Sequence, residues 1–417
     1  MKVMFLNASD VEGGAARGAV RLLKGVRAAG VDACLLVQRK VGDEPFVIGP
    51  KTNLGKAMGL VRPVLESLAV RCCAGSQTRM FSPALLPDSL PSQVATFDPD
   101  IIHLHWVANG MMRVETCRRF KRPIVWTLHD SWPFTGGCHL PFDCTRYRES
   151  CGSCPALGSS RSRDLSSWLW SRKRRAWRGV ELTVVAPSRW LGECAKASSL
   201  LQNVRIEVIP NGLDLRRYKP FDKRCAREAL SLPQDRQLIL FGGKGGTVDR
   251  NKGFHLFVQA MQELAEKGGR KAVEVVLFGS AEPASPTDIK LNAHYLGRMH
   301  DDVSLALMYA AADLFVAPSI QENLPYTVME AMACGTPCVA FNQGGMPDLV
   351  EHGRTGYLAR AFEIDDLTEG ISWVLDDADR LKRLSIQARQ KVEDEFSLER
   401  VARRYMELYT TLAERSI

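Results

Sequence analysis

The chain has 417 residues, 45% hydrophobic and 24% charged, which is typical of an ordinary folded protein and excludes an intrinsically disordered one. The length is sufficient for two domains with full hydrophobic cores. No uninterrupted apolar run approaches the roughly 18 residues that a membrane-spanning helix needs. The N-terminal stretch is too soon interrupted for a signal peptide, so we expect a cytoplasmic protein.

The net charge of +8 is unevenly distributed. Residues 1–200 carry 28 Lys and Arg against 16 Asp and Glu, whereas the rest of the chain carries 27 against 31. A basic half favours an anionic partner such as a membrane surface, a phosphorylated lipid or a nucleic acid. A lopsided but solvated surface is the plain alternative.

Short aliphatic runs alternate with helical patterns along the chain. This alternation predicts an α/β fold in which two doubly wound Rossmann-like domains with parallel sheets face a cleft. We place the first domain over 1–210, the second over 211–390, and a C-terminal helix over 391–417 that packs back on the first domain. The predicted strands are Val3–Asn7, Ala33–Gln38, Ile101–His105, Ile124–His129, Thr183–Pro187, Leu238–Gly242, Val273–Gly279, Leu314–Pro318 and Pro337–Phe341.

A glycine pair, Gly13 and Gly14, follows the first predicted strand and opens a helix. As a bare turn it carries little information. Arg17 lies one turn into that helix, where it could reach a phosphate or could simply be solvated.

Histidines cluster at the ends of two later strands. His129 and Asp130 end the strand over 124–129, and the neutral imidazole of His129 could orient a hydroxyl or carry a proton. His103 and His105 share one face of the preceding strand. They could help line an acceptor pocket or could be structural.

Four cysteines fall within 17 residues: Cys138, Cys144, Cys151 and Cys154. The terminal Cys-x2-Cys suits a tetrahedral structural Zn²⁺ site, with His139 as a substitute ligand. Disulfides are less plausible in a reducing cytoplasm, and free thiols are the remaining alternative.

Residues 168–178 form a basic helix candidate with Trp168, Trp170 and Trp177. Tryptophans beside cationic side chains suit interfacial anchoring, and 51–73 is a second apolar and basic stretch. We therefore expect peripheral membrane contact through 168–178. A tryptophan-packed helix with a solvated cationic face is the alternative.

In the second half, a glycine-rich loop over 242–253 joins a strand to a helix and contains Lys252. Its glycines allow close backbone approach, and Lys252 supplies a positive charge at the helix start. The loop is neither a Walker A motif nor a GxGxxG fingerprint. On spacing alone, a tight strand–helix turn explains it equally well.

Glu322 and Glu330 are the most informative pair. Glu322 lies on a loop, whereas Glu330 lies inside the apolar helical run 328–333, where an ionised group is costly unless something binds it. Pro325 and Gly335 predict the start and end of this helix. A helix N-terminus beside a carboxylate can hold a phosphate together with a hydroxyl-rich group, which points to a nucleotide-sugar site.

Taken together, the glycine/lysine loop, the Glu-x7-Glu helix and Gly344-Gly345-Met-Pro-Asp-Leu-Val resemble retaining glycosyltransferases of family 4, which have the GT-B fold. Val208–Asp214, Ala186–Trp190 and His129-Asp130 add to this resemblance, which runs from Met1 to about Leu412. The segment over 136–155 is similar to a Cys-rich insertion in a subset that builds polysaccharides or lipopolysaccharides.

The resemblance implies donor-binding roles for single residues. Glu330 would take the ribose hydroxyls of the nucleotide, and Glu322 would contact the donor sugar near its anomeric centre. The backbone N–H groups of Asn323 and Leu324 would face the sugar or the diphosphate. Lys252 would pair with the diphosphate.

The resemblance also implies roles around these residues. The family usually has an Arg shortly before the lysine, and here Lys244 or Arg250 could take its part. Gly14, with Arg17 near it, would lie under the donor diphosphate. His129 would contact the donor hexose near the attacked carbon, and the acceptor-side residues would be His105 and Asp130.

A nucleoside diphosphate gains negative charge as it leaves. Fixed cations and a helix N-terminus can lower that barrier without a metal ion, and no Asp-x-Asp pair ends a predicted strand. We therefore expect catalysis without a cofactor, with structural zinc as the one candidate metal. Retention of configuration follows if the acceptor attacks the face that the diphosphate leaves.

The sequence thus predicts a cytoplasmic enzyme at the inner face of the membrane. It would transfer a hexose with retention from a UDP- or GDP-linked sugar to a lipid-linked glycan acceptor. The expected process is bacterial exopolysaccharide or lipopolysaccharide synthesis. A nucleotide-sugar epimerase or a phosphorylase on the same fold is one alternative. Another is a zinc-bearing nucleic-acid binder using 172–175, but it leaves the carboxylate pair without a purpose, so we expect no nucleic-acid partner.

Overall fold

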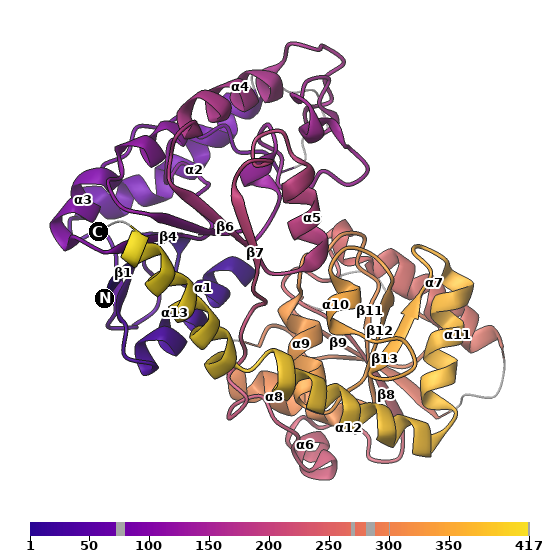
Figure 1. Cartoon of the computed structure of the whole chain (residues 1–417). Coiled ribbons are helices and arrows are strands. Elements are labelled where there is room, and N and C mark those ends of the chain that lie inside the picture. The colour runs from indigo at the N-terminus through magenta and orange to yellow at the C-terminus, as the bar shows by residue number, and fades with distance from the viewer. Residues whose placement is uncertain (72–79, 268–271, 281–287, 300, 416–417) are drawn as a thin grey trace. The chain divides into compact units, whose positions relative to one another are not determined.

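The computed structural model describes residues 1–71, 80–267, 272–280, 288–299 and 301–415 (Figure 1). The chain divides into two compact units. The N-terminal unit comprises Met1–Gly212 and Glu399–Ile417, and the C-terminal unit comprises Leu213–Leu398. Each unit contains one parallel sheet with helices on both faces, which confirms the predicted pair of doubly wound α/β domains.

The N-terminal unit is built on a seven-stranded sheet in the order β3-β2-β1-β4-β5-β6-β7. Its strands are β1 (Lys2–Ser9), β2 (Asp32–Arg39), β3 (Val47–Ile48), β4 (Ile101–Leu104), β5 (Ile124–Thr127), β6 (Leu182–Ala186) and β7 (Arg205–Val208). Its helices are α1 (Gly13–Ala28), α2 (Asn53–Arg71), α3 (Leu90–Phe97), α4 (Leu165–Trp177), α5 (Arg189–Ala197) and α13 (Leu398–Arg415), with short 3₁₀ turns η1 (Val114–Arg119), η2 (Trp132–Phe134), η3 (Arg146–Arg148) and η4 (Pro155–Leu157).

Helices α1 and α13 cover one face of this sheet and lie side by side in Figure 1. The apolar residues of α1 recur at helical spacing, with Leu22, Leu23 and Val26 buried against the strands, as an amphipathic surface helix requires. Tyr405 and Tyr409 of α13 pack into the same core. The last helix of the chain therefore completes the N-terminal unit.

The C-terminal unit has a six-stranded sheet in the order β10-β9-β8-β11-β12-β13. The strands are β8 (Gln237–Gly242), β9 (Val273–Phe278), β10 (Ala293–Tyr295), β11 (Leu314–Ala317), β12 (Cys338–Phe341) and β13 (Gly356–Ala359). The helices are α6 (Lys223–Ala229), α7 (Phe254–Glu266), α8 (Asp302–Ala311), α9 (Tyr326–Ala333), α10 (Met346–Leu349), α11 (Ile364–Leu375) and α12 (Ala378–Glu395), with the 3₁₀ turn η5 (Arg250–Lys252).

The boundary predicted at residue 391 is wrong, because it falls inside α12. That helix continues to Glu395 and buries Ala388 and Val392 in the C-terminal unit. The chain changes unit between Leu398 and Glu399.

We predicted that the tryptophans of 168–178 would anchor the protein to a membrane. Helix α4 does not present them in that way. Trp170 and Trp177 are buried, and only Trp168 is exposed. Within the predicted basic run, Arg172 is buried and pairs with Glu115 at 2.7 Å, and Lys173 is fully buried. The interpretation as a tryptophan-packed helix is therefore the correct one for most of this segment, with Arg174 and Arg175 exposed on its outer face.

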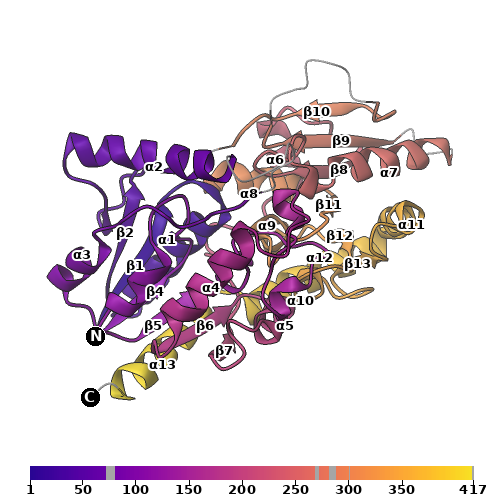
Figure 2. The ribbon, with the colours of Figure 1, turned by 90° about the horizontal axis from the view of Figure 1, so that it is seen from above.

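Helix α2 has the broad exposed apolar face that α4 lacks. It lies beside β2 at the margin of the N-terminal unit (Figure 2). Among the described residues of the chain, no helix is long and apolar enough to span a membrane. The exposed apolar side chains of α2, each between 40% and 75% exposed, are Leu54, Met58, Leu60, Val61, Val64, Leu65 and Leu68.

Candidate donor and acceptor sites

In the C-terminal unit, Lys252 and Glu322 form a half-buried ion pair. The ammonium of Lys252, at the end of η5, lies 2.5 Å from the carboxylate of Glu322, in the loop between β11 and α9. Burial alone would lower the pKa of Lys252, but the facing carboxylate raises it above its ordinary value. The structure thus brings together two of the three predicted catalytic residues, with Lys252 fully charged.

Asn251 fixes the loop that carries Glu322. Its side-chain amide donates to the backbone oxygen of Gln321 at 2.9 Å, and its side-chain oxygen accepts from the Gln321 N–H at 3.1 Å. The backbone oxygen of Asn251 accepts from Ile320 at 2.8 Å. Sequence reasoning missed this residue, although its position beside Lys252 in the glycine-rich loop was a usable signal.

The glycine motif after β12 supports the same loop from the other side. Gly345 donates its N–H to the backbone oxygen of Glu322 at 2.9 Å. Gly344 has φ +60°, and a Cβ there would lie 2.3 Å from the same oxygen. Only glycine fits such a position, so this pair holds Glu322 by its backbone.

The glycine-rich loop after β8 also needs its glycines. Gly242 has φ +152°, and a Cβ there would lie 2.2 Å from the Phe278 backbone oxygen. In the same way, a Cβ at Gly279 would lie 2.0 Å from the Gly243 backbone oxygen. Close packing of the loop on the end of β9 explains these glycines without a ligand. At Gly243, a Cβ would lie in ordinary contact, 3.5 Å from Thr327 in the first turn of α9.

Two candidates remain for the cation that precedes Lys252. Lys244 and Arg250 are both exposed, and neither forms an ion pair with a residue that the structure describes.

Asn323 and Leu324 lie directly before α9, which begins at Tyr326 and ends before Gly335, at φ +80°. The predicted start and end of this helix are therefore close to the observed ones.

Glu330 is buried inside the unit, with 1% of its surface exposed. Its carboxylate accepts a hydrogen bond from the hydroxyl of Tyr309, in α8, at 3.1 Å. Burial and the nearby Glu330 charge raise the pKa of Tyr309 well above its ordinary value, so this tyrosine stays a donor. The structure thus gives Glu330 a partner within the fold, and its ribose role remains a prediction.

In the N-terminal unit, the loop after β1 is open in front of its glycines. Gly13, at φ +89°, starts α1, and a Cβ at Gly13 or Gly14 would meet no atom within 4 Å. Arg17 is half-buried in the first turns of α1 and makes no ion pair with a described residue. The loop therefore leaves space beside a helix start, as an anion would need.

His129 and His105 contact each other at the ends of β5 and β4. The Nδ1 of His105 lies 2.9 Å from the Nε2 of His129, and the two rings stack. Burial lowers the pKa of His129 to about 4, although Asp130 opposes the shift. His129 is thus neutral near pH 7. His105 is buried. It therefore does not line an open acceptor pocket, which was one of the two roles that the sequence allowed.

His103 belongs to the core that α13 completes. Its Nδ1 lies 2.6 Å from the hydroxyl of Tyr409, and its Nε2 lies 2.8 Å from the hydroxyl of Thr127. Tyr405 also bonds to Thr127, at 2.8 Å. His103 therefore has a structural role, which is one of the two alternatives that the sequence left open.

Asp130 is held within a buried network. Its carboxylate accepts from the indole of Trp106 at 2.7 Å, from the Trp132 N–H at 2.8 Å, and bonds to His139 at 2.6 Å. Burial would raise the pKa of Asp130, but His139 and these donors lower it. The other ring nitrogen of His139 bonds to Ser82 at 2.9 Å. The substitute metal role predicted for His139 is therefore wrong, because both nitrogens are occupied.

Comparison with known families agrees with this organisation. Residues 12–217 match the family "Glycosyltransferase Family 4", and residues 222–391 match the family "Glycosyl transferases group 1". The first match ends shortly after the boundary between the units at Gly212 and Leu213, and the second lies within the C-terminal unit.

A curated relative is the D-inositol 3-phosphate glycosyltransferase of Nocardia farcinica. It is 32% identical over 196 residues, which is 44% of this chain and 43% of the relative. A similar protein of Catenulispora acidiphila is matched over 44% of its length. The matched part thus spans less than half of these first relatives.

Two solved structures share the fold over nearly the whole chain. The sucrose-phosphate synthase of Thermosynechococcus elongatus has a TM-score of 0.69 at 19% identity, covering 99% of each chain. Anabaena HepE, solved in complex with UDP and glucose, has a TM-score of 0.66 at 20% identity, covering 99% of this chain and all of that one. The sheet topologies, these likenesses and the two family matches show that the chain belongs to the group 1 glycosyltransferases with the GT-B fold.

Proposed function

We propose that this protein transfers a hexose, with retention, from a nucleoside diphosphate sugar to a glycan acceptor. The observation that carries the proposal is the Lys252–Glu322 pair, clamped by Asn251 and Gly345 before the start of α9. A fixed cation beside a fixed carboxylate offers one group for a diphosphate and one for a sugar hydroxyl. Their backbone supports mean that little reorganisation is needed when the donor binds.

In the proposed reaction, Lys252 exchanges its contact with Glu322 for the donor diphosphate. Its charge then stabilises the leaving group as negative charge develops, an effect typically worth about 3–4 kcal/mol for one preorganised donor. Glu322, released from the ion pair, accepts a hydrogen bond from the sugar. Asn323 and Leu324 present their N–H groups at the start of α9, and Glu330 takes the ribose.

For the donor base we favour uridine over guanosine. The support is the likeness to HepE, which was solved with UDP and with UDP-glucose. His129 is assigned to the donor hexose near the attacked carbon, as a neutral imidazole that can accept a hydroxyl proton. Its contact with His105 orients the ring. No step of this scheme needs a metal ion.

For the acceptor we propose a lipid-linked glycan, as in the synthesis of bacterial exopolysaccharide or lipopolysaccharide. The support is the exposed apolar face of α2. Single exposed apolar residues are ordinary, but a contiguous patch of this kind marks an interaction surface. Glu66 is the only acidic residue between 51 and 71 and is buried, whereas Lys51, Lys56 and Arg71 are exposed. An apolar face flanked by cations fits an anionic membrane surface, at its cytoplasmic side.

The experiment that tests this function incubates the chain with UDP- and GDP-linked α-hexoses and follows the released sugar by NMR. We expect one donor to be consumed, with slow release of the α-anomer before mutarotation in the absence of an acceptor. Release of the β-anomer would contradict retention. Conversion into another nucleotide sugar without loss of the nucleotide would instead support the epimerase alternative.

A further inference from the structure

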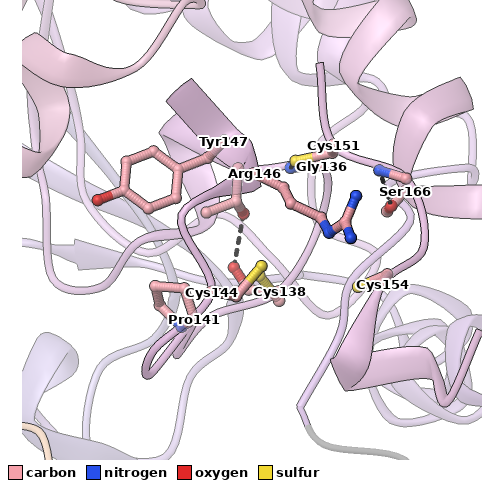
Figure 3. A pocket seen from close by; sticks show the side chains of 11 residues that line it. Gly136, Cys138, Pro141, Cys144, Arg146, Tyr147, Cys151, Cys154 and Ser166 are labelled. Carbon is pink, nitrogen blue, oxygen red and sulfur yellow. Dashed lines mark hydrogen bonds between the residues drawn. The ribbon is translucent and has the colours of Figure 1, made fainter. Parts of the chain in front are cut away.

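The four cysteines predicted as metal ligands meet at one small cavity in the N-terminal unit. Figure 3 shows their side chains around it, with Arg146 among them. The cavity has a volume of about 10 Å³, which is space for roughly one water-sized sphere. Gly136 also lines it, and the Gly136 N–H donates to the sulfur of Cys151 at 3.1 Å. The cysteines are Cys138, Cys144, Cys151 and Cys154.

The turn that carries the last two cysteines has an unusual backbone. Cys151, Gly152 and Ser153 have φ values of +54°, +105° and +43° in succession. A Cβ at Gly152 would lie 2.2 Å from the Ser162 backbone oxygen, so only glycine fits. Left-handed conformations are unfavourable at non-glycine residues, and such strain persists where the surroundings impose it.

Hydrogen bonds to residues outside the cysteine cluster fix that turn. The Ser153 N–H donates to the Arg161 backbone oxygen at 2.7 Å, and the Cys154 N–H donates to the Asp164 carboxylate at 2.9 Å. The result of the strained turn is that both thiols of a Cys-x2-Cys pair face the same cavity as the two earlier cysteines. Among the described cysteines none forms a disulfide, so nothing covalent accounts for their convergence.

A buried lysine beside this cavity has no carboxylate ion-pair partner among the described residues. Lys173 is fully buried, and its ammonium donates to the backbone oxygens of Thr135, at 3.1 Å, and Trp132. It also lies 3.7 Å from the centre of the Trp132 ring. No carboxylate among the described residues forms an ion pair with it. A buried charge is normally paired, and Thr135 places Lys173 directly behind the cavity wall.

We propose that Cys138, Cys144, Cys151 and Cys154 form a structural Zn²⁺ site. Four thiolates around one Zn²⁺ carry a net charge of −2, and Lys173 with Arg146 supplies two positive charges against it. On binding, four S–H groups release four protons and four sulfur–zinc bonds form, with no change of oxidation state. The site would tie the segment between β5 and α4 to itself and so support Asp130.

The side chains must move for this to happen. As they stand, no three His, Cys, Asp or Glu side chains within the described ranges surround a common point closely enough to hold a metal ion. Sulfur–zinc bonds are about 2.3 Å long, so the thiols must turn inward about their side-chain torsions.

The test measures metal content in the full chain, purified without chelators and with a thiol reductant, and then loaded with Zn²⁺ and desalted. We expect about one zinc ion per chain, and replacement by Co²⁺ should produce the intense absorption of a thiolate-ligated tetrahedral ion. The variant carrying Cys151→Ser and Cys154→Ser should lose nearly all bound metal. Cys225→Ser, which changes an exposed cysteine of the C-terminal unit, should retain it.

Thiol counting on the native chain keeps the test independent of whether the double variant folds. In the zinc-loaded protein the four cluster thiols should be unreactive, and a chelator should make them reactive in parallel with zinc release. The proposal is overturned if the loaded chain holds no zinc, or if the double variant holds as much as the wild type. It is also overturned if the four thiols are missing without metal, which would mean disulfides.

Discussion

Glu322 accepts a hydrogen bond from Gly345 at 2.9 Å through its backbone, while its side chain contacts Lys252 at 2.5 Å. The backbone of this residue is thus fixed, and its carboxylate is aimed at one cation. The glycine motif after β12 holds the backbone of Glu322, and the lysine loop after β8 contacts its carboxylate. This relationship explains why the motifs occur together in the chain, and it leads to the first prediction.

Gly344→Ala should impair both stability and donor binding. The new Cβ would lie 2.3 Å from the Glu322 oxygen at φ +60°, so the loop must move. Gly353→Ala is the matched control, because Gly353 has φ +76° but open space around its Cβ position. We expect the control to cost about 1–2 kcal/mol, the left-handed penalty alone, and Gly344→Ala to cost more. Equal losses in urea unfolding would contradict the steric argument.

Tyr309→Phe should destabilise the C-terminal unit by about 1–3 kcal/mol, because the buried carboxylate of Glu330 loses a hydrogen-bond donor. Tyr357→Phe removes a comparable hydroxyl, which donates to Asp366 at 2.7 Å in a half-buried position. Water can replace that donor, so the loss should be smaller. Equal free energies of unfolding for the two variants would show that Glu330 does not depend on Tyr309.

The pKa of His129, about 4, predicts a defined pH dependence of stability. Its ordinary value is 6.5, so the folded state binds fewer protons than the unfolded state between these values. The contribution is complete above pH 6.5 and is lost as the pH falls towards 4. Replacing His129 with Gln should flatten the decrease of unfolding free energy in this window, whereas His352→Gln, at an exposed position, should not. An unchanged slope in the His129 variant would contradict the assignment.

The exposed face of α2 should determine membrane binding. Replacing Val61 and Leu65 with Glu adds two negative charges at exposed apolar positions, so sedimentation with vesicles containing anionic lipid should fall severalfold. The control replaces Val248 and Ile386, exposed apolar residues of the C-terminal unit, with Glu. If both double variants lose binding equally, only net charge matters. If neither does, α2 is not the membrane surface.

Much of the fold could be predicted because buried parallel strands read as short apolar runs. The missed strands are short and lie at sheet edges: β3, β7, β10 and β13 contribute few residues and are mostly not fully buried. The tryptophans of α4 misled the prediction, since composition alone does not say which face of a helix is covered. Capping of α4 by Asp164 was readable, but its burial depended on η1 and on Glu115, which lie far away in the chain.

The parts of the candidate site in which a motif constrains the backbone were predictable. The contacts between side chains of different loops were less so. Glu322, Lys252 and the Gly344–Gly345 pair were identified from the sequence, and the structure brings them together. The contacts of Asn251 with Gln321 and of His105 with His129 join residues from different loops. No local pattern encodes such pairs, because they depend on which strands become neighbours.

The most direct test of the account is calorimetric titration of UDP, GDP and UMP into the wild type, Lys252→Met and Lys290→Met, with a chelator present. Lys290 is a surface lysine paired with Asp288 at 2.6 Å, so its variant controls for lost charge. We predict that one diphosphate binds and that Lys252→Met weakens it by about 10- to 100-fold, the range for a lost charged hydrogen bond. UMP, which lacks the second phosphate, should be affected less. Unchanged diphosphate affinity in Lys252→Met would contradict the central claim that this lysine holds the donor.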